Sequence, residues 1–426
     1  MNLGEKMARK LKPKWNRIIL ALTMLIVIVV LLVYLASFII SFIASFSDKR
    51  NSMYCTKASV KIVSQIVNQQ YDKLETIGDS FFYGESLIFA SQLYDSIGKY
   101  NAYEGKTVKL INICNNKSYS FELGDRFDDF IPISNLDVGI YEVFFVDNEI
   151  EMRVTLDKNR HDTVYTITKE NSSKKVEVFA DKDYFKEMSE TSILKENYLF
   201  IKVTKASLPN NVYDIVIDPS FNEDDDTTES NVIYTENDES ILLYDIASEV
   251  AEELRKLGYK VLVTRENLDG YMQTYGINGR IHRTIEAKAK IYIGLTFEKS
   301  SDDTKSGAQL IHSYYSSDKL SDEIYQKLAQ LEMVFDQKPV RTSQRTNDYD
   351  NLIDIREIGG VALQAASFSE RAERENGSFA YTQYGVNGVY LILGYSSNKQ
   401  DIESFNTKYH DWAKAIATGI DDYIKR

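Results

Sequence analysis

The chain has 426 residues, a net charge of −13, two cysteines and four histidines. This length predicts two or three domains, and a hydrophobic content of 43% excludes a mostly disordered protein. The acidic balance argues against nucleic acid as a partner, and two cysteines are too few for a disulfide framework or a four-thiolate zinc site. Whether Cys55 and Cys114 form one disulfide is left open by the sequence.

Positive charge is concentrated at the N-terminus. Residues 1–17 carry six Lys or Arg and one Glu, which leaves a net charge of −18 on the residues beyond 47. Between them, residues 18–47 contain no charged side chain, and about 20 apolar residues are enough for a helix to cross a bilayer. A signal peptide has an apolar region of only about 7–15 residues. The pattern therefore predicts a retained transmembrane helix at 18–47, with the basic tail in the cytoplasm and the remaining chain outside the membrane.

Short runs of apolar or alternating residues follow the predicted membrane helix. Residues 48–85 have no clear pattern and are interpreted as a stalk or uncertain segment, with a short helix or stalk at 60–74. From residue 86 to 206, turn signals such as Asn115-Asn116 separate short predicted strands. Strands at about this spacing are typical of a β-sandwich, so a small β-sandwich-like domain is predicted at 86–206, with a linker near Pro209. The predicted strands are 107–113, 139–146, 152–156, 163–168, 175–179 and 198–203.

Strands and helices alternate in the last half of the chain. A strand at 213–217 precedes a helix at 240–257, in which apolar residues recur at helical spacing and Gly258 provides a stop. Alternation of this kind predicts an α/β domain at 211–426, with a central sheet and helices on both faces. The other predicted strands are 260–264, 291–295, 308–314 and 389–393. The other predicted helices are 278–288 and 320–335, with one or two closing helices over 401–424.

Several segments of this region together resemble a known family. The segments are Ile-Val-Ile-Asp-Pro at 215–219, Glu239, Gly-Tyr-Lys-Val-Leu-Val-Thr-Arg at 258–265, Asp269, Arg280, the strand 289–296, Gly-Tyr-Ser-Ser-Asn at 394–398, Asp401 and the closing helix 413–423. In this order they are similar to the zinc-dependent N-acetylmuramoyl-L-alanine amidases, over about residues 211–426. Members of that family cleave the amide between the lactyl group of the peptidoglycan glycan and the first L-alanine of the stem peptide.

The resemblance also implies which positions would line the active-site cleft. Family members bind zinc with two His and one Glu, and a further Glu takes part in catalysis. In this chain Asp218 is retained in the first strand, Phe221 stands at the first His position and Glu239 at the Glu ligand position. Thr296 stands at the second His position, and Ile392 at the position of the catalytic Glu.

These replacements remove the groups that the chemistry needs. A catalytic zinc requires about three protein ligands, but Phe221 has no donor atom and Thr296 would be a poor ligand. Ile392 cannot accept or donate a proton. Glu239 alone would hold zinc weakly, and its carboxylate is in any case favourable in the first turn of a helix. We therefore expect no bound cofactor and no catalytic residue, with zinc expected only if the metal site has been altered.

Other residues could rebuild a metal site, although their placement does not favour it. The acidic run 223–226, with Glu229, could bind Ca²⁺ through oxygen ligands, but it lacks the EF-hand spacing and is also explained as a solvated loop. None of the four histidines falls at either expected zinc position. They are His161, His282, His312 and His410.

The sequence leads to three hypotheses about function. The favoured one is a catalytically inactive amidase-fold protein, anchored in the membrane, that binds peptidoglycan or an envelope protein from the extracytoplasmic side. The alternative is an active N-acetylmuramoyl-L-alanine amidase with an altered metal site. The third is a structural element of an envelope complex, in which Phe221 and Ile392 fill the cleft.

Overall fold

The computed structural model describes Met24, Val30 and residues 60–90, 103–169, 172–186, 190–219, 239–265, 279–312, 316–341 and 384–426. The chain divides into two compact units, Met1–Lys57 and Ala58–Arg426. The predicted transmembrane helix at 18–47 lies outside the described residues, apart from Met24 and Val30. None of the helices in the described part of the chain has the length and apolarity of a membrane span.

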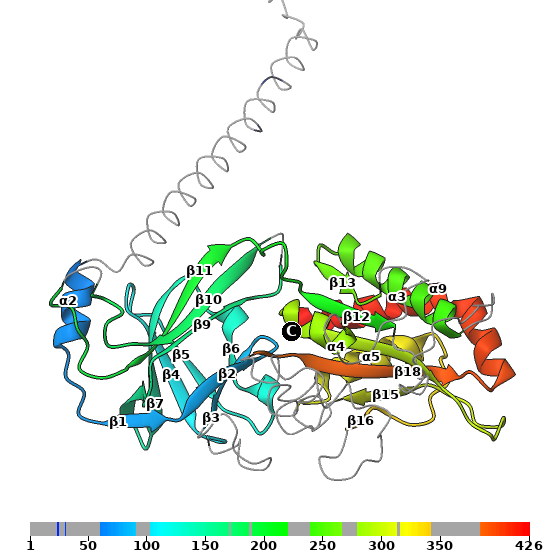
Figure 1. Ribbon diagram of the computed structural model, residues 1–426, viewed down its shortest axis with the longest axis horizontal. Coiled ribbons are helices and arrows are strands. Elements are labelled where there is room, and N and C mark those ends of the chain that lie inside the picture. The colour runs from blue at the N-terminus through cyan, green and yellow to red at the C-terminus, as the bar shows by residue number, and fades with distance from the viewer. Residues whose placement is uncertain are drawn as a thin grey trace, which may run out of the picture. The chain divides into compact units, whose positions relative to one another are not determined.

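The second unit begins with a short helix and a β-rich region (Figure 1). Helix α2 spans Val60–Asn68, where the sequence predicted a helix or stalk. An eight-stranded sheet follows, in which β1, β8, β7, β11, β10 and β9 are neighbours in that order and β4 pairs with both β5 and β7. Its strands are β1 (Leu74–Ile77), β4 (Thr107–Asn112), β5 (Ser118–Glu122), β7 (Gly139–Asp147), β8 (Ile150–Leu156), β9 (Arg160–Tyr165), β10 (Ser173–Ala180) and β11 (Leu199–Ala206).

A four-stranded sheet shares a core with the first one. Its order is β17, β2, β3, β6, and one apolar cluster contains Phe81 and Ile88 from this sheet with Val108 and Phe145 from the larger sheet. Two facing sheets with a common core confirm the predicted β-rich region. The strands of this sheet are β2 (Asp79–Tyr83), β3 (Ser86–Ala90), β6 (Ile131–Pro132) and β17 (Tyr384–Gly385), and the short 3-10 helices η1 (Phe127–Asp129) and η2 (Ile133–Asn135) flank β6.

The β-rich region begins earlier than residue 86, where the sequence placed its start. Residues 74–83, interpreted as part of a stalk or uncertain segment, form β1 and β2. The aromatic residues Phe81, Phe82 and Tyr83 are at most 1% exposed, because β2 belongs to the four-stranded sheet and contributes to the core that the two sheets share. Cys114, just after β4, is disulfide-bonded, while Cys55 lies outside the described residues.

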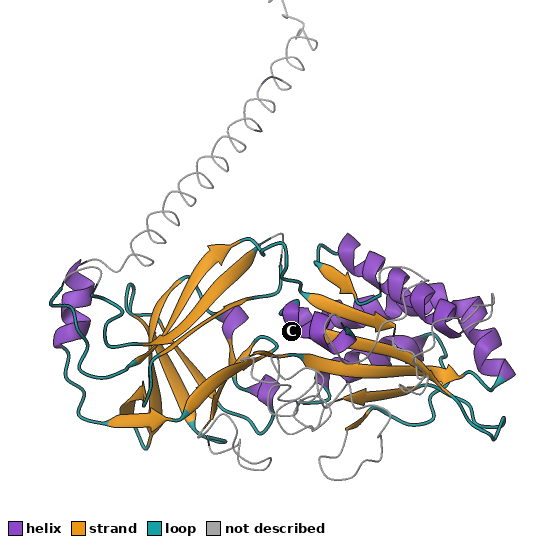
Figure 2. Cartoon of the chain, viewed as in Figure 1, coloured by secondary structure: helices purple, strands orange, loops and turns teal. Residues whose placement is uncertain are grey.

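The last half of the chain forms the predicted α/β domain, here called the amidase-like domain (Figure 2). Its six-stranded sheet has the order β13, β12, β14, β18, β15, β16. Strands β13, β12, β14 and β18 are parallel, and β15 runs antiparallel to β18. The strands are β12 (Ile215–Pro219), β13 (Val261–Val263), β14 (Ile291–Glu298), β15 (Gln309–His312), β16 (Val340–Arg341) and β18 (Asn387–Tyr395), and the helices are α3 (Glu239–Lys256), α4 (Arg280–Glu286), α5 (Lys319–Gln330) and α9 (Lys399–Lys425).

Side-chain alternation along the strands explains how the helices cover the sheet. On one face, Ile217, Ile293 and Leu391 share a core with the apolar sides of α3, α5 and α9. On the other face, Asp218 and Tyr292 point toward α4. The carboxylate of Asp218 accepts hydrogen bonds from Tyr292 of β14 and from Arg280, the first residue of α4. The strands are thus buried on both faces, as is usual in parallel sheets, and the face toward α4 carries polar side chains.

Candidate functional site

The expected site lies at the carboxyl ends of the parallel strands, on the face of the sheet that α4 covers. Asp218 pairs in register with Gly294 on the neighbouring strand β14, and Thr296 is the direct cross-strand partner of Ile392 on β18. The three side chains of Asp218, Thr296 and Ile392 follow the alternation of that face. The structure thus brings these positions onto adjacent strands.

Asp218 is fully buried and fully engaged in hydrogen bonds. One carboxylate oxygen accepts a bond of 2.5 Å from Thr264 Oγ1. The other accepts bonds of 2.6 Å from the guanidinium of Arg280 and from the hydroxyl of Tyr292. A buried carboxylate with a guanidinium and two hydroxyl donors is balanced in charge. We infer that Asp218 holds α4 and β13 to the central strands and is not available to a substrate.

Thr296 and Ile392 are packed into the sheet. Thr296 is completely buried, and its hydroxyl donates to the carbonyl oxygen of Phe297 at 3.2 Å. Ile392 is 2% exposed. Close by on the same face, the ring of Tyr390 covers Gly294, where an added Cβ would lie 2.6 Å from the ring. Neither side chain offers a good zinc ligand, because the hydroxyl of Thr296 is engaged in a hydrogen bond and Ile392 has no donor atom.

Glu239 begins α3 and is half-buried. The next residue, Ser240, accepts hydrogen bonds from the guanidinium of Arg265 to its hydroxyl and its carbonyl oxygen. Arg265 follows the end of β13, so this contact fixes the first turn of α3 at the carboxyl end of the sheet, the end where Asp218 lies. Phe221 and the acidic run 223–226 with Glu229 lie outside the described residues.

The described side chains of His161 and His410 bond acidic residues away from this site. His161 on β9 lies 3.6 Å from Glu177, and His410 on α9 bonds Glu249 at 2.5 Å. His312 is buried in β15, and His282 belongs to α4. Within the described ranges, which omit 220–238 and 266–278, no three His, Cys, Asp or Glu side chains are grouped as they would be around a metal.

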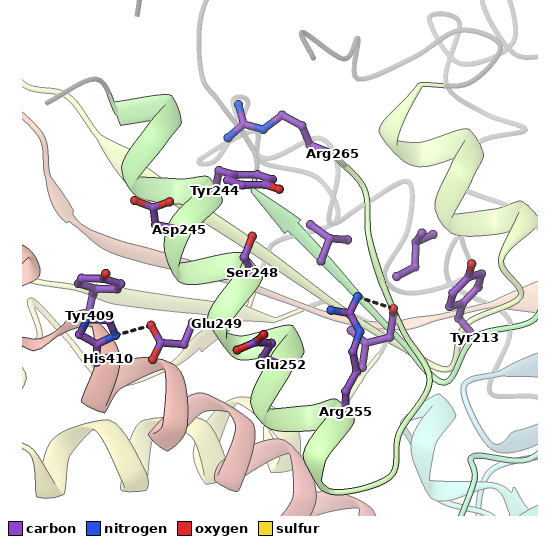
Figure 3. A pocket seen from close by; sticks show the side chains of 13 residues that line it. Tyr213, Tyr244, Asp245, Ser248, Glu249, Glu252, Arg255, Arg265, Tyr409 and His410 are labelled. Carbon is purple, nitrogen blue, oxygen red and sulfur yellow. Dashed lines mark hydrogen bonds and ion pairs between the residues drawn. The ribbon is translucent and has the colours of Figure 1, made fainter. Parts of the chain in front are cut away.

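A groove of about 820 Å³ is lined by residues of α3, α9 and the edge strand β13 (Figure 3). Sequence reasoning did not identify it, because its residues come from α3, β13 and α9 and only the fold brings them together. Burial raises the pKa of the Asp245 carboxyl here, with Arg265 opposing and Glu249 adding to the rise. Among the expected cleft residues that the structure describes, none lines the groove. Its lining comprises Tyr213, Tyr244, Asp245, Ser248, Glu249, Glu252, Arg255, Val261, Leu262, Val263, Arg265, Tyr409 and His410.

Figure 3 shows how side chains of different kinds converge on this groove. Tyr244 lies under the guanidinium of Arg265, whose centre is 5.4 Å from the ring centroid. Glu249 points from α3 to His410, and Arg255 bonds the backbone carbonyl of Val261 at 3.0 Å. The groove therefore offers tyrosine rings and carboxylates on the surface, separate from the packed strand ends.

Residues 215–422, just under half of the chain, match the model of the family described as N-acetylmuramoyl-L-alanine amidase. Over these residues the amidase-like domain is similar to this family. Its members are zinc-dependent hydrolases of peptidoglycan, so the match confirms the fold class and family predicted from the sequence. No curated protein matches the chain.

Solved structures to which the chain shows similarity include three amidases. N-acetylmuramoyl-L-alanine amidase AmiC2 of Nostoc punctiforme is 15% identical, with 51% of this chain and 100% of that chain covered and a TM-score of 0.35. The catalytic domain of CwlV from Bacillus (Paenibacillus) polymyxa var. colistinus is 15% identical, with 50% and 99% covered and a TM-score of 0.35. The CwlD amidase from Clostridioides difficile, in complex with the GerS lipoprotein, is 16% identical, with 50% and 98% covered and a TM-score of 0.34.

Proposed function

We propose that this protein is a membrane-anchored component of the cell envelope whose amidase-like domain binds peptidoglycan without cleaving it. The observation that carries the proposal is the pair Thr296 and Ile392. They are buried cross-strand partners at the positions that the family resemblance assigns to a zinc ligand and to the catalytic Glu. A hydroxyl that donates to its own strand and an alkyl side chain supply neither metal coordination nor proton transfer.

The α3–β13 groove is the surface that we assign to binding. Polymers of sugar and peptide offer many hydrogen-bonding groups, which the carboxylates of Glu249 and Glu252 can engage. Tyrosine contributes a large apolar ring with a polar tip, and Tyr213, Tyr244 and Tyr409 line the groove. A concave surface with aromatic walls and a few polar groups has the general character of a ligand site.

The membrane anchor and the extracytoplasmic location are parts of the proposal that rest on the sequence. The uncharged run at 18–47 and the basic residues before it support a single span with the N-terminus in the cytoplasm. The disulfide at Cys114 supports an oxidising compartment for the bulk of the chain. Protease treatment of intact spheroplasts should degrade the amidase-like domain, whereas protection of that domain would contradict this location.

Two measurements on the full-length protein test binding without catalysis. Metal analysis after exposure to Zn²⁺ and gel filtration should find far less than one zinc per chain. The protein should cosediment with insoluble purified peptidoglycan, and the double variant Tyr244→Ala with Glu252→Ala should cosediment less. Glu286→Ala, at an exposed Glu on α4 outside the groove, is the matched control. Stoichiometric zinc, or cosedimentation unchanged by the groove variant, would contradict the proposal.

An active amidase with an altered metal site is the second candidate. The family match over residues 215–422 favours it, as does Glu239 at the Glu ligand position in the first turn of α3. The first His position, Phe221, could then be replaced by a ligand from another segment. Zinc bound at one ion per chain, with its loss in Glu239→Gln, would support this candidate over the first.

A further inference from the structure

The β-rich region and the amidase-like domain are joined through the amino ends of the parallel strands. Strand β17 just before β18 pairs with β2, and the backbone N–H of Gly84 donates to Gly385 O at 3.0 Å. The hydroxyl of Tyr83 donates to the side chain of Asn387 at 3.4 Å. These contacts form a joint between segments about 300 residues apart in the sequence.

A cavity of about 170 Å³ lies at this joint. Its walls come from both parts of the unit, so neither part encloses the cavity alone. Since a water molecule occupies about 30 Å³ of liquid, the cavity has room for a molecule of a few carbon atoms. The lining comprises Tyr83, Gly84, Glu85, Ser86, Asp128, Pro132, Ser134, Asn135, Ile167 and Lys169 from the β-rich region, with Lys290, Ile291, Lys319, Asn387, Tyr423, Ile424 and Arg426 from the amidase-like domain.

Lys290, immediately before β14, contributes a buried ammonium group with few hydrogen-bond partners to this wall. The side chain is 3% exposed, and its Nζ donates one hydrogen bond, to Lys288 O at 2.5 Å. An ammonium group has three N–H donors. Among the residues that the structure describes, no carboxylate lies within 4.0 Å of this nitrogen. A buried charge without an ion pair is costly, and burial lowers the pKa of Lys290 to about 8 although Glu85 and Asp214 oppose the shift.

The two carboxylates in the wall are already engaged. Glu85 accepts a bond of 2.7 Å from the backbone N–H of Ile167. Asp128 accepts bonds from Ser317, at 2.8 Å from its N–H and 2.5 Å from its hydroxyl. Burial raises the pKa of both carboxyls and so opposes the charged form of each. Lys169 adds a further positive group to the same wall.

We propose that this cavity binds a small carboxylate, whose oxygens accept hydrogen bonds from Lys290 and whose charge compensates the buried ammonium. The carboxyl group would lie beside Lys290, and the amide of Asn387 adds a polar group to the same wall. Because both parts of the unit line the cavity, such a ligand stabilises the joint between them. This role is independent of whether the amidase-like domain cleaves peptidoglycan.

Titration of the full-length protein in nonionic detergent tests the proposal. Acetate, succinate and inorganic phosphate serve as separate probes in isothermal calorimetry, with sodium chloride matching the ionic strength. Acetate or succinate should bind saturably. Lys290→Met should weaken that binding by about tenfold or more, since a hydrogen bond to a charged group is lost. Lys338→Met, at an exposed lysine outside the cavity, should leave the affinity unchanged.

Three outcomes would overturn the proposal. They are no saturable binding of either carboxylate, binding of phosphate alone, and equal binding to the wild type and Lys290→Met. A second variant guards against a fold defect in Lys290→Met. Lys169→Met changes an exposed lysine at the same wall and should weaken carboxylate binding while the circular dichroism spectrum stays unchanged. If both single variants, Lys169→Met and Lys290→Met, bind the carboxylates with full affinity, the proposed site is wrong.

Discussion

The two ends of the parallel strands differ in how many hydrogen-bond partners their buried charged groups have. At the carboxyl ends, where α/β proteins usually bind ligands, Asp218 is matched by Arg280 and two hydroxyl donors, while Thr296 and Ile392 are packed. At the amino ends, Lys290 is buried with a single hydrogen bond and faces a cavity. The two ends of the sheet therefore differ in how far their buried charged groups are paired. Where a ligand is needed depends on whether each buried charge already has its partners.

The largest effect is expected at the carboxyl end. Asp218→Ala removes the acceptor of Arg280, Tyr292 and Thr264, and it leaves a buried guanidinium without its carboxylate. We expect a loss of about 4 kcal/mol in the free energy of unfolding, measured by urea denaturation. Asp303→Asn, on an exposed loop, is the control. A loss below about 1 kcal/mol would mean that Asp218 is not part of the packing.

Ile392 provides a second measure of the packed carboxyl end. Ile392→Ala removes a buried side chain that is 2% exposed and should cost about 3 kcal/mol, because the cavity is only partly filled by its neighbours. Denaturation in urea again gives the value. A nearly neutral result would show an open cleft at this strand end, and it would weaken the contrast between the two ends of the sheet.

Lys290 should make the stability of the protein depend on pH at the amino end. The folded pKa of about 8 lies below the usual value of 10.5, so the unfolded chain binds more protons between these pH values and stability rises with pH. The charged groups that influence Lys290 are Glu85, Asp214 and Lys288. From pH 7 to pH 10 the gain should be roughly 2 kcal/mol in the wild type and absent in Lys290→Met. The same rise in both proteins would assign it to another group.

The smallest effect distinguishes two glycines with similar backbone angles. Gly84 at the joint has φ of +55°, and a Cβ there would lie 3.2 Å from the carbonyl oxygen of Lys290. Gly105 has φ of +72° and no atom within 4 Å of such a Cβ. Alanine should strain both positions equally, so the close contact should make Gly84→Ala less stable than Gly105→Ala by about 1 kcal/mol. Equal thermal stability would indicate a loosely packed joint.

Much of the α/β domain could be predicted because its periodicity is local. The run at 240–257 gave α3 within a residue or two at each end, since Gly258 follows the last turn and adopts a φ of +96°. The helix expected at 320–335 ends at Gln330 instead. The chain turns at Glu332, which has a φ of +57°. Because no glycine stands there, the sequence did not indicate the end of the helix. Helix α9 is one continuous helix where one or two were expected.

The joint and the groove could not be predicted, because both depend on contacts between distant segments. Nothing in the sequence around Tyr384 indicates pairing with Phe82. Lys290 follows Ala287, Lys288 and Ala289, a pattern that indicates a solvated lysine before a strand. In the structure its side chain is buried. The cleft positions Asp218, Thr296 and Ile392 were placed through the family resemblance, which fixed their strands but not the hydrogen bonds that engage them.

Cleavage of peptidoglycan is the most direct test of the central claim, that the amidase-like domain binds without hydrolysis. The full-length protein is incubated with purified peptidoglycan and added Zn²⁺, and new amino-terminal L-alanine is quantified by chemical labelling, with an active family member as the positive control. We expect no release above the sample without protein. Release that depends on zinc and stops when a chelator is added would contradict it.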